Sequence, residues 1–423
     1  MRDTVVKINY LKLIIAAAIV ALLSVLLADS LKMITEYYEE LLFAKVEHFP
    51  WTIFILPSIG ITLIYFLRKY LFKGRQNKGI KEIYQTLEKR KNSLPAYKIP
   101  SHYFNGFLTV IFGGSTGIEV STVVASAAIG AAAHKRKSIA NVYKTELVCA
   151  GVAAGVATLF ASPLAGFLFA VEVIAKKVTK PILTSCAIAA LISWGAIYFT
   201  SPHHFFKHAI LDWNWQAAPF FLLVSVIGGV LAVYFTKLVI GIKSRFAAIE
   251  NNFIRVNLGA LLIGAAIFFF PQLYGDSYHA IPELFNTATQ EPFTITFAGL
   301  MIALVLLKPI AASLTLGAGG DGGVFAPSIV AGALLGIFTA SFCNHFFGTQ
   351  LIVINFALVG AAAVLSAAIH APLTAVFLIC SMAPGGYILF LPVLAASFLA
   401  KYAAKTLCSY TVYSYDKHQQ KLV

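Results

Sequence analysis

The residues best suited to chemistry lie in two short segments where glycines and polar residues interrupt apolar sequence. The first segment, Gly114 to Val124, carries Glu119, and the second, Gly320 to Val330, carries Asp321 and Pro327. The two segments are offset by about 206 residues. In a membrane chain such interruptions are costly unless the freed backbone groups face something useful. A pair of interrupted segments at matching places in two halves therefore indicates a transport site.

Both segments are typical of helices that begin inside the membrane. Such a helix start presents N–H groups and the positive end of the helix dipole, which favour a bound anion without any full positive charge. Pro327 suits the first turn of a helix, and glycines such as Gly117 and Gly322 let the backbone approach an ion closely. Small residues also favour tight helix packing, so these features alone leave both interpretations open.

Glu119 favours the anion-site interpretation. It is an ionisable group in an apolar span without a basic residue nearby in sequence, and intramembrane carboxylates are functional-site candidates. At the mouth of an anion site, a carboxylate could take the anion's place when ionised and vacate it when protonated. It would then act as a gate, a proton carrier or both. Glu172 also looks buried, but a role as a helix cap or a partner of Lys176 explains it better.

The composition indicates an all-α polytopic membrane protein. Of the 423 residues, 59 % are hydrophobic and only 12 % are charged, with a mean hydropathy of +0.81. A soluble protein would carry roughly a quarter charged residues. Apolar runs near the spanning length of about 20 residues recur, for example Tyr10 to Ala28 and Ala217 to Phe235. Shorter runs bounded by Gly and Pro predict that some segments do not cross fully.

The net charge of +14 comes largely from three basic clusters, which lie within Arg68 to Lys98, His134 to Lys144, and Lys176 to Lys180. The positive-inside rule places these clusters in the cytoplasm and explains them without nucleic-acid binding. A basic vestibule would also attract anions. The five cysteines are scattered through apolar sequence without metal-ligand spacing, so we assign them to packing and predict no metal.

Sequence similarity between the halves extends beyond the two interruptions. Ala150 to Ala154 followed by Ser162 to Ala165 is similar to Val359 to Ala363 followed by Ala371 to Thr374, at an offset of about 209 residues. We therefore expect a single transmembrane domain, 1–423, with one repeat at about 10–201 and another at about 214–397. A final ion-lining helix is expected at about 400–415. Transporter repeats often have inverted topology, with the binding site at their interface.

These residues resemble the CLC family of chloride channels and proton/chloride exchangers, over about residues 10–415. Gly323 to Pro327 fits the family's GxFxP motif, and Gly117 to Ser121 is similar to its G(K/R)EGP motif, with the glycine and glutamate kept. Ser162 to Gly166 and Ala371 to Thr374 resemble its two proline-leucine helix starts. The resemblance implies a CLC-type fold of two inverted repeats with many tilted and broken helices, without a cytoplasmic regulatory domain.

The resemblance also implies roles for individual residues. Glu119 corresponds to the external gating glutamate, which also carries the proton. Tyr413 corresponds to a ligand of the central anion, and the backbone N–H groups of Val324 and Phe325 are further ligands. Gly117, at the first helix start, is also expected to bind the anion. The resemblance implies a homodimer with a separate anion path in each subunit.

Two positions depart from the family pattern. Lys78 falls where the family's GSGIP motif has the serine that lines the central site. A lysine there could hold the anion tightly, pair with Glu119 or occupy the site itself; if the loop shifts, Lys78 is a solvated cytoplasmic charge. Val173 stands at the internal proton-transfer glutamate of many exchangers, which argues for channel-like behaviour or a different proton route.

The leading hypothesis is transport of chloride or a similar monovalent anion, through proton-coupled exchange gated by Glu119. The alternatives are a passive CLC-type chloride channel and a family member blocked or altered by Lys78. The expected partners are the anion, protons, membrane lipid and a second copy of the chain, with no nucleic acid. We expect a multi-pass protein of the plasma (inner) membrane.

An intramembrane enzyme is disfavoured. The sequence has no His-Glu-x-x-His pair and no Gly-x-Ser-x-Gly elbow, and Asp321 with Ser328 is too little for a nucleophile and base. We therefore assign no catalytic residue and no cofactor.

Overall fold

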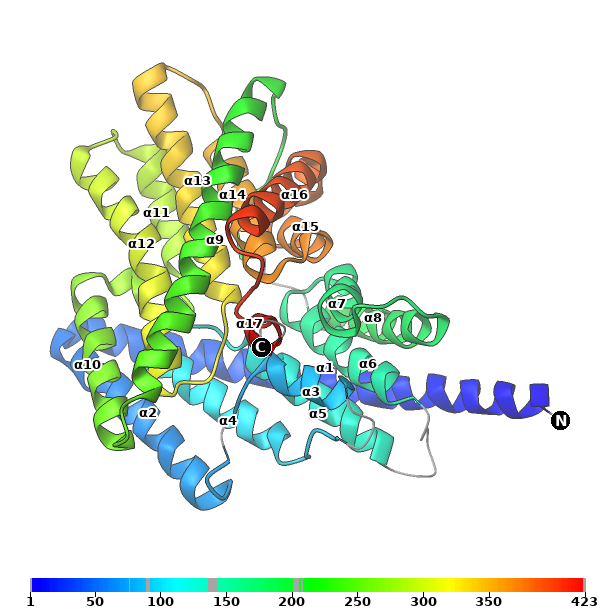
Figure 1. The fold of residues 1–423 in the computed structure, drawn as a ribbon. Coiled ribbons are helices and arrows are strands. Elements are labelled where there is room, and N and C mark those ends of the chain that lie inside the picture. The colour runs from blue at the N-terminus through cyan, green and yellow to red at the C-terminus, as the bar shows by residue number, and fades with distance from the viewer. Residues whose placement is uncertain are drawn as a thin grey trace. The chain divides into compact units, whose positions relative to one another are not determined.

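The computed structural model describes residues 2–75, 77–88, 92–135, 143–200, 205–206 and 208–420, and the regular structure in these ranges is all helical (Figure 1). This confirms the all-α prediction. Several residues of the basic clusters and the end of the first expected repeat lie outside the described residues: Lys89, Arg90, Lys91, Arg136, Lys137 and Ser201.

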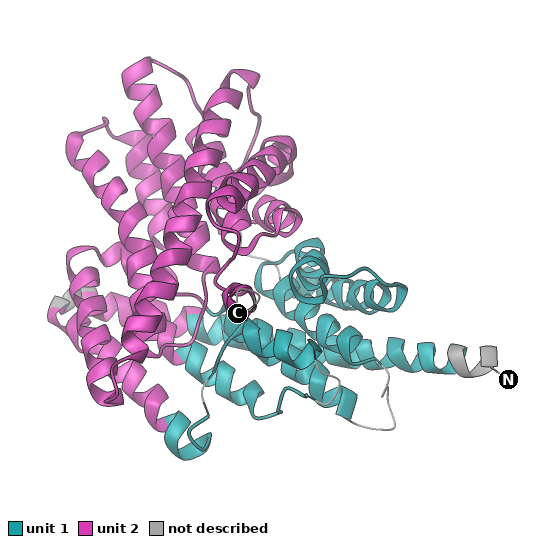
Figure 2. Ribbon diagram, in the orientation of Figure 1, with its two compact units in different colours: residues 1–35, 67–107, 118–203 teal, residues 36–66, 108–117, 204–423 magenta. Residues whose placement is uncertain are grey.

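The chain divides into two compact units, which Figure 2 colours separately. Unit 1 comprises Met1–Thr35, Leu67–Phe107 and Ile118–His203, and unit 2 comprises Glu36–Phe66, Leu108–Gly117 and His204–Val423. Two helices, α1 (Arg2–His48) and α4 (Lys98–Ile111), run through a boundary between these ranges. Because neither unit coincides with an expected repeat, the repeats at about 10–201 and 214–397 stay a prediction.

Unit 1 is otherwise built from helices that follow the expected first half of the chain. They are α3 (Ile80–Glu88), α5 (Glu119–Lys135), α6 (Lys144–Leu159), α7 (Pro163–Phe169), the π-helical turn η3 (Ala170–Ala175) and α8 (Lys180–Thr200). Residues 120–131 of α5 are all buried, as are most of those in α6. The two helices pack closely because alanine and glycine dominate their sequences.

Unit 2 contains most of the helices of the chain. They are α2 (Leu56–Phe66), α9 (Ala218–Ala247), α10 (Asn252–Phe269), α11 (Ala280–Gln290), α12 (Ile295–Ala318), α13 (Phe325–Phe347), α14 (Val353–Ile369), α15 (Pro372–Ser381), α16 (Phe390–Leu407) and α17 (Tyr415–Gln420). Helices α13 and α14 form the centre of the unit, since almost all of their side chains are buried.

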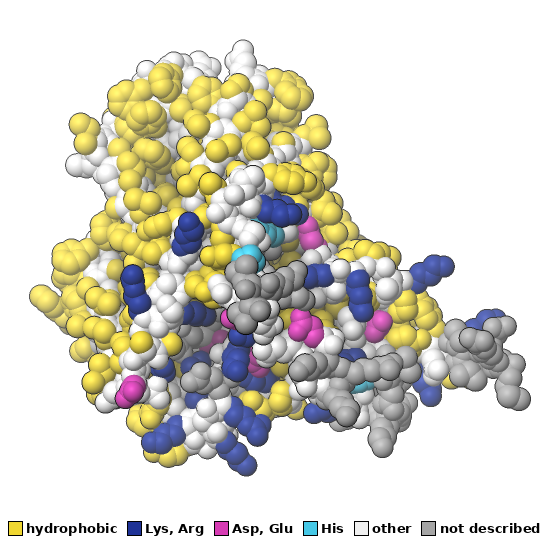
Figure 3. Space-filling view, viewed as in Figure 1, with side chains coloured by type: hydrophobic (Ala, Val, Ile, Leu, Met, Phe, Trp, Pro, Cys, Tyr) yellow, Lys and Arg dark blue, Asp and Glu magenta, His cyan; other side chains and the backbone are white. Residues whose placement is uncertain are grey.

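The surface is that of a protein surrounded by lipid. Among the described residues, eight helices are long and apolar enough to cross a membrane. Large hydrophobic side chains such as Leu26, Leu222 and Leu261 are exposed on them, and hydrophobic atoms dominate the visible surface of unit 2 in Figure 3. Helices α7, α14 and α15 are apolar but shorter. The structure thus agrees with the expected mixture of full and partial spans.

Proline positions set the start of several helices. Pro163 and Pro372 each occupy the first turn, at the two proline-leucine starts, and Pro327 lies in the first turn of α13. In a first turn the missing N–H of proline costs no helical hydrogen bond.

The last helix differs from the expectation of a continuous helix at about 400–415. Helix α16 ends at Leu407 because Cys408 adopts an extended conformation (φ −151°, ψ 111°). The Thr411 N–H then donates to Ser414 Oγ at 2.9 Å, which closes a turn before α17. Tyr413 therefore lies in this turn, outside any helix.

Helices α13 and α14 touch backbone to backbone. A Cβ atom at Gly336 would lie 1.8 Å from the Phe356 carbonyl oxygen, and one at Gly332 would lie 2.3 Å from the Gly360 carbonyl oxygen. These obstacles are backbone atoms, which cannot rotate away as a side chain can.

We predict that Gly336→Ala lowers the thermal unfolding midpoint of the detergent-solubilised protein, because the two helices must separate and overpacking costs about 1–3 kcal/mol or more. The matched control is Gly299→Ala in α12, where nothing lies within 4 Å of the added methyl group. That variant should keep or raise the midpoint, since alanine favours a helix over glycine by about 1 kcal/mol. Equal midpoints for the two variants would contradict the packing argument.

Candidate functional site

The start of the first interruption, at Gly114 to Gly117, lies beside the second interruption in unit 2. The Gly323 N–H donates to Thr116 Oγ1 at 3.1 Å. The Asp321 N–H donates to Thr109 Oγ1 at 2.9 Å. Threonine hydroxyls from the first segment (Thr116) and from α4 (Thr109) therefore accept two backbone N–H groups of the second segment before α13 begins.

The first segment is held from the other side by α12. The Ser115 N–H donates to Thr315 Oγ1 at 3.0 Å, near the end of that helix. The Lys308 ammonium, which is fully buried, donates to Ser115 Oγ at 2.9 Å and to Ser277 Oγ at 2.7 Å. It also donates to the Gly275 carbonyl oxygen at 3.1 Å. These contacts leave little freedom for the segment that leads into α5.

The sequence analysis did not single out Lys308. The signal was present, since Lys308 is the one charged residue in the apolar run from Ile295 to Ala318, and intramembrane ionisable residues mark important positions. A carboxylate cluster lies nearby in unit 2: Glu39 Oε1 accepts the Asp276 N–H at 3.2 Å, and ligand atoms of Glu39, Asp276 and His279 lie within 4.8 Å of one another. These acidic groups lie close to the buried ammonium, because the Gly275 carbonyl that accepts from Lys308 directly precedes Asp276 in the chain.

The start of α13 brings three predicted anion ligands into one unit. Val324 precedes the helix and Phe325 is its first residue, and both are 1 % exposed. The Phe325 ring centroid lies 6.5 Å from that of Tyr413. N–H groups in a first helical turn point out of the helix end, where they and the helix dipole favour an anion.

Glu119 is the first residue of α5, in unit 1. Its side chain is 3 % exposed. A carboxylate in this place interacts favourably with the helix dipole when it is ionised. Gly117, the other predicted residue of this segment, is the last residue of the unit 2 range that ends there.

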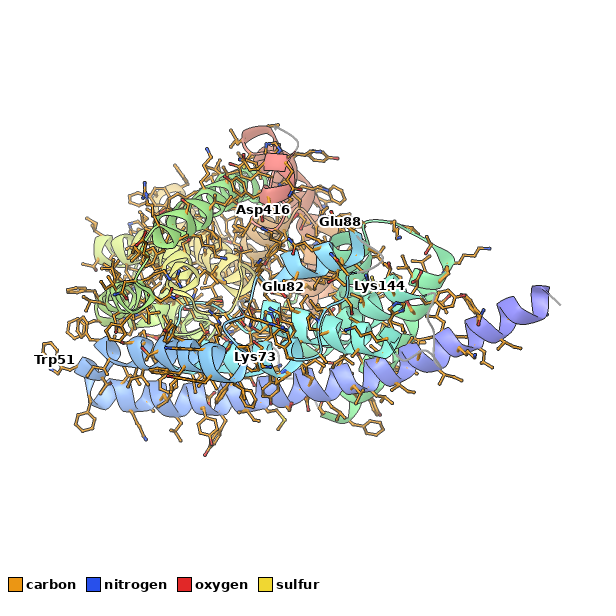
Figure 4. The ribbon with its side chains drawn as sticks, turned by 60° about the horizontal axis from the view of Figure 1, so that its bottom comes forward. Trp51, Lys73, Glu82, Glu88, Lys144 and Asp416 are labelled. Atoms are coloured by element: carbon orange, nitrogen blue, oxygen red, sulfur yellow. The ribbon has the colours of Figure 1, made fainter. Side chains whose placement is uncertain are left out.

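The loop that carries Lys78 is held by a buried ion pair in unit 1. Lys98 Nζ lies 2.8 Å from Glu82 Oε1 and donates to Asn77 Oδ1 at 3.0 Å. The Lys78 N–H donates to the same Glu82 carboxylate. Glu82 lies near the start of α3 and Glu88 at its end (Figure 4). The sequence analysis did not identify this pair, because its partners are separated by a loop.

The Lys78 side chain itself is exposed. This agrees with the interpretation of Lys78 as a solvated charge at a loop. Its role as an anion ligand stays a prediction.

The position expected for an internal proton glutamate is apolar and enclosed. Val173 is buried in η3, and its carbonyl oxygen accepts the Tyr84 hydroxyl at 3.0 Å. Burial raises the pKa of the Tyr84 phenol above its usual value, which keeps the donor protonated. Lys176 lies over the Tyr84 ring, 4.2 Å from its centroid, and Glu172 is half-buried. The pairing of Glu172 with Lys176 stays a prediction.

The amino-acid sequence is similar to a known protein family and to several curated proteins. The family model described as voltage gated chloride channel matches residues 59–405. The H(+)/Cl(−) exchange transporter ClcA of Cronobacter sakazakii is 28 % identical over 393 residues, covering 88 % of this chain and 81 % of the relative. The putative chloride channel protein ClcB-like of Ralstonia nicotianae is 25 % identical over 386 residues, covering 86 % and 85 %.

Solved structures confirm the fold. A CLC-type fluoride/proton antiporter superposes with a TM-score of 0.78 at 22 % identity, covering 95 % of this chain and 96 % of the other. A slow cyanobacterial Cl−/H+ antiporter superposes with a TM-score of 0.80 at 20 % identity, covering 97 % and 98 %.

We predict that Thr116→Val destabilises the second interruption, because the buried Gly323 N–H loses its acceptor at a cost of about 1–3 kcal/mol. Thr116→Ser keeps the hydroxyl and should retain most of the stability. The measurement is the thermal unfolding midpoint of each variant in detergent. A valine variant as stable as the serine variant would show that the hydroxyl does not hold this segment.

A second prediction concerns the buried ion pair. Lys98→Met should destabilise the protein by about 3–5 kcal/mol, because it leaves the Glu82 carboxylate buried without its cation. The double variant Lys98→Met/Glu82→Gln removes the uncompensated charge and should be more stable than the single variant. The thermal unfolding midpoints of the two variants test this prediction. A double variant less stable than Lys98→Met would show that the uncompensated Glu82 charge is not the cause of the destabilisation.

Proposed function

Because the chain belongs to the voltage-gated chloride channel (CLC) family, we propose that it exchanges chloride or a similar monovalent anion for protons across a membrane. The observation that carries the anion part is the contact of the second interruption, just before α13, with Thr116 of the first interruption and Thr109 of α4, all in unit 2. Relatives named H(+)/Cl(−) exchange transporters support the coupling to protons. Family membership confirms a transport protein over the intramembrane enzyme that the sequence disfavoured.

The proposed anion ligands are Gly117, Val324, Phe325 and Tyr413, with Lys78 as a further candidate. Partial positive charge at the start of α13 attracts the anion, and no full cation is needed for this. The proximity of the Phe325 and Tyr413 rings supports a shared role for these two residues. Neutral ligands would let the anion leave again, as transport requires.

Glu119 is proposed as the gate and the proton carrier. Three observations support this role: Glu119 is the first residue of α5, its side chain is buried, and the sequence that follows is apolar. When ionised, the carboxylate competes with the anion for positive potential at a helix start; when protonated, it does not. Protonation and anion passage are thereby linked.

Two alternatives to proton-coupled exchange, a passive channel and a blocked or altered family member, each rest on one residue. Val173 stands where many exchangers have the internal proton-transfer glutamate, and this favours a passive channel. Lys78 favours a blocked or altered member, although its side chain is exposed.

For assembly and location, we propose a homodimer in the plasma (inner) membrane, each subunit with its own anion path.

We predict that purified protein in liposomes moves protons uphill when a chloride gradient is imposed, with external pH and chloride recorded together. Glu119→Gln should abolish proton movement and make the anion flux independent of pH, because the amide cannot ionise. Glu172→Gln is the matched control and should keep both fluxes. Chloride flux in the native protein without any proton movement would establish the channel alternative instead.

A separate binding measurement tests whether Lys78 blocks the anion path. Chloride binding by calorimetry is compared for the native protein and Lys78→Ser. Binding that appears only in the serine variant would establish Lys78 as a block, whereas equal binding supports its place as a solvated charge.

A further inference from the structure

One face of α4 carries a stripe of buried polar side chains. Lys98 is 3 % exposed, and Ser101, His102 and Asn105 are fully buried. Their spacing of three, four and seven residues places them on one side of the helix. Phe104, on another side, is 46 % exposed. Polar groups buried in a protein interior are costly unless they are satisfied, so a complete stripe of them indicates a use.

The stripe is connected by hydrogen bonds to the exposed loop of Lys78. Lys98 Nζ and Ser101 Oγ both donate to Asn77 Oδ1, at 3.0 Å and 3.1 Å. Asn105 Nδ2 in turn donates to Ser101 Oγ at 3.4 Å. A continuous series of polar groups therefore runs from Asn77, which is half-buried beside Lys78, to Asn105 in the interior of unit 1.

The inner end of the stripe reaches α5 close to Glu119. A Cβ atom at Gly106 would lie 2.5 Å from Ser121 Oγ, so α4 and α5 are in contact there. Ser121 is fully buried, and its hydroxyl has no hydrogen-bond partner among the described residues. Buried hydroxyls are usually satisfied by a protein group or by an ordered water, so Ser121 offers a partner to a water molecule. Ser121 follows Glu119 by two residues, in the first turn of α5.

His102 is the group of the stripe best suited to move a proton. An imidazole ring can accept a proton on one nitrogen and release the proton on the other. His102 lies one helical turn after Lys98 and one turn before Gly106, between the buried ion pair and the contact with Ser121. The Lys98 ammonium would repel a proton, but the Glu82 carboxylate at 2.8 Å offsets that charge.

We propose that protons reach Glu119 along this face of α4, with His102 as the relay. The proton enters at the Asn77 loop and is accepted by one ring nitrogen of His102. The other ring nitrogen gives up its proton through water at Ser121 to the Glu119 carboxylate, and the ring returns to its first tautomer. All of these residues lie in unit 1. This inference rests on the proposed function, and it supplies a route where Val173 offers no titratable side chain.

The test compares the native protein with His102→Leu in liposomes, under a chloride gradient with pH recorded. We expect chloride flux to persist in the variant, while the number of protons moved per chloride falls by about tenfold or more, as for loss of a general acid–base group. Tyr103→Phe is the matched control, because the Tyr103 hydroxyl faces α1 and donates to Ser30 Oγ at 3.2 Å. It should keep the native ratio.

The outcomes separate the two proposals. Native protein that moves chloride without protons would overturn the proposed exchange itself, before any variant is considered. Native coupling that survives in His102→Leu at an unchanged ratio would overturn the relay alone. Loss of both fluxes in a folded His102→Leu protein would also overturn it, because His102 would then serve the anion path.

Ser121→Ala covers the case in which His102→Leu does not fold. The change removes one hydroxyl and adds no bulk, so α4 and α5 can pack as before. A lower proton-to-chloride ratio supports the route, and an unchanged ratio contradicts it.

Discussion

The structure depends on how backbone groups are satisfied where helices stop inside an apolar environment. A freed N–H in a bilayer interior costs several kcal/mol unless a partner within the protein accepts it. Here the partners are threonine hydroxyls: Thr116 accepts the Gly323 N–H, and Thr109 accepts that of Asp321. Each hydroxyl belongs to the other interruption or to the helix before it. The second interruption is therefore held by the first and by α4, and the first is held in turn by Thr315 and Lys308 of α12.

These hydrogen bonds fix the segment before α13, so the N–H groups in the first turn of α13 are not needed to hold it in place. Threonine side chains satisfy the backbone just before the helix, at Asp321 and Gly323, so the segment is rigid without using the groups of Val324 and Phe325. A rigid, electropositive helix start suits the anion proposed there, because little ordering free energy is lost on binding. The buried Lys308 adds to this rigidity away from α13, because it donates hydrogen bonds to Ser115 Oγ and to the Gly275 carbonyl oxygen.

Local features were predictable from the sequence, and long-range pairings were not. Hydropathy predicted the membrane spans, and proline with its neighbours predicted the starts of α7, α13 and α15. The end of α16 was not predicted, because the extended conformation of Cys408 depends on the turn closed by Thr411 and Ser414. The pair of Lys98 with Glu82 was also missed, since charge patterns predict partners only at helical spacing and these residues are 16 positions apart.

Three lysines show why residue type alone could not assign the site. Lys78 stands at the position where the family resemblance expects an anion ligand, yet its side chain is exposed and its backbone N–H serves Glu82. Lys98 is buried against a carboxylate, and Lys308 is buried among hydroxyl and carbonyl oxygens. The carboxylate neutralises the charge of Lys98, whereas the oxygens around Lys308 only solvate it. The acidic side chains of Glu39 and Asp276 lie just beyond these oxygens, next to Gly275. Lys308 therefore acts on Ser115, in the segment that leads to Glu119, through the hydrogen bond that it donates, although the sequence drew attention to Lys78.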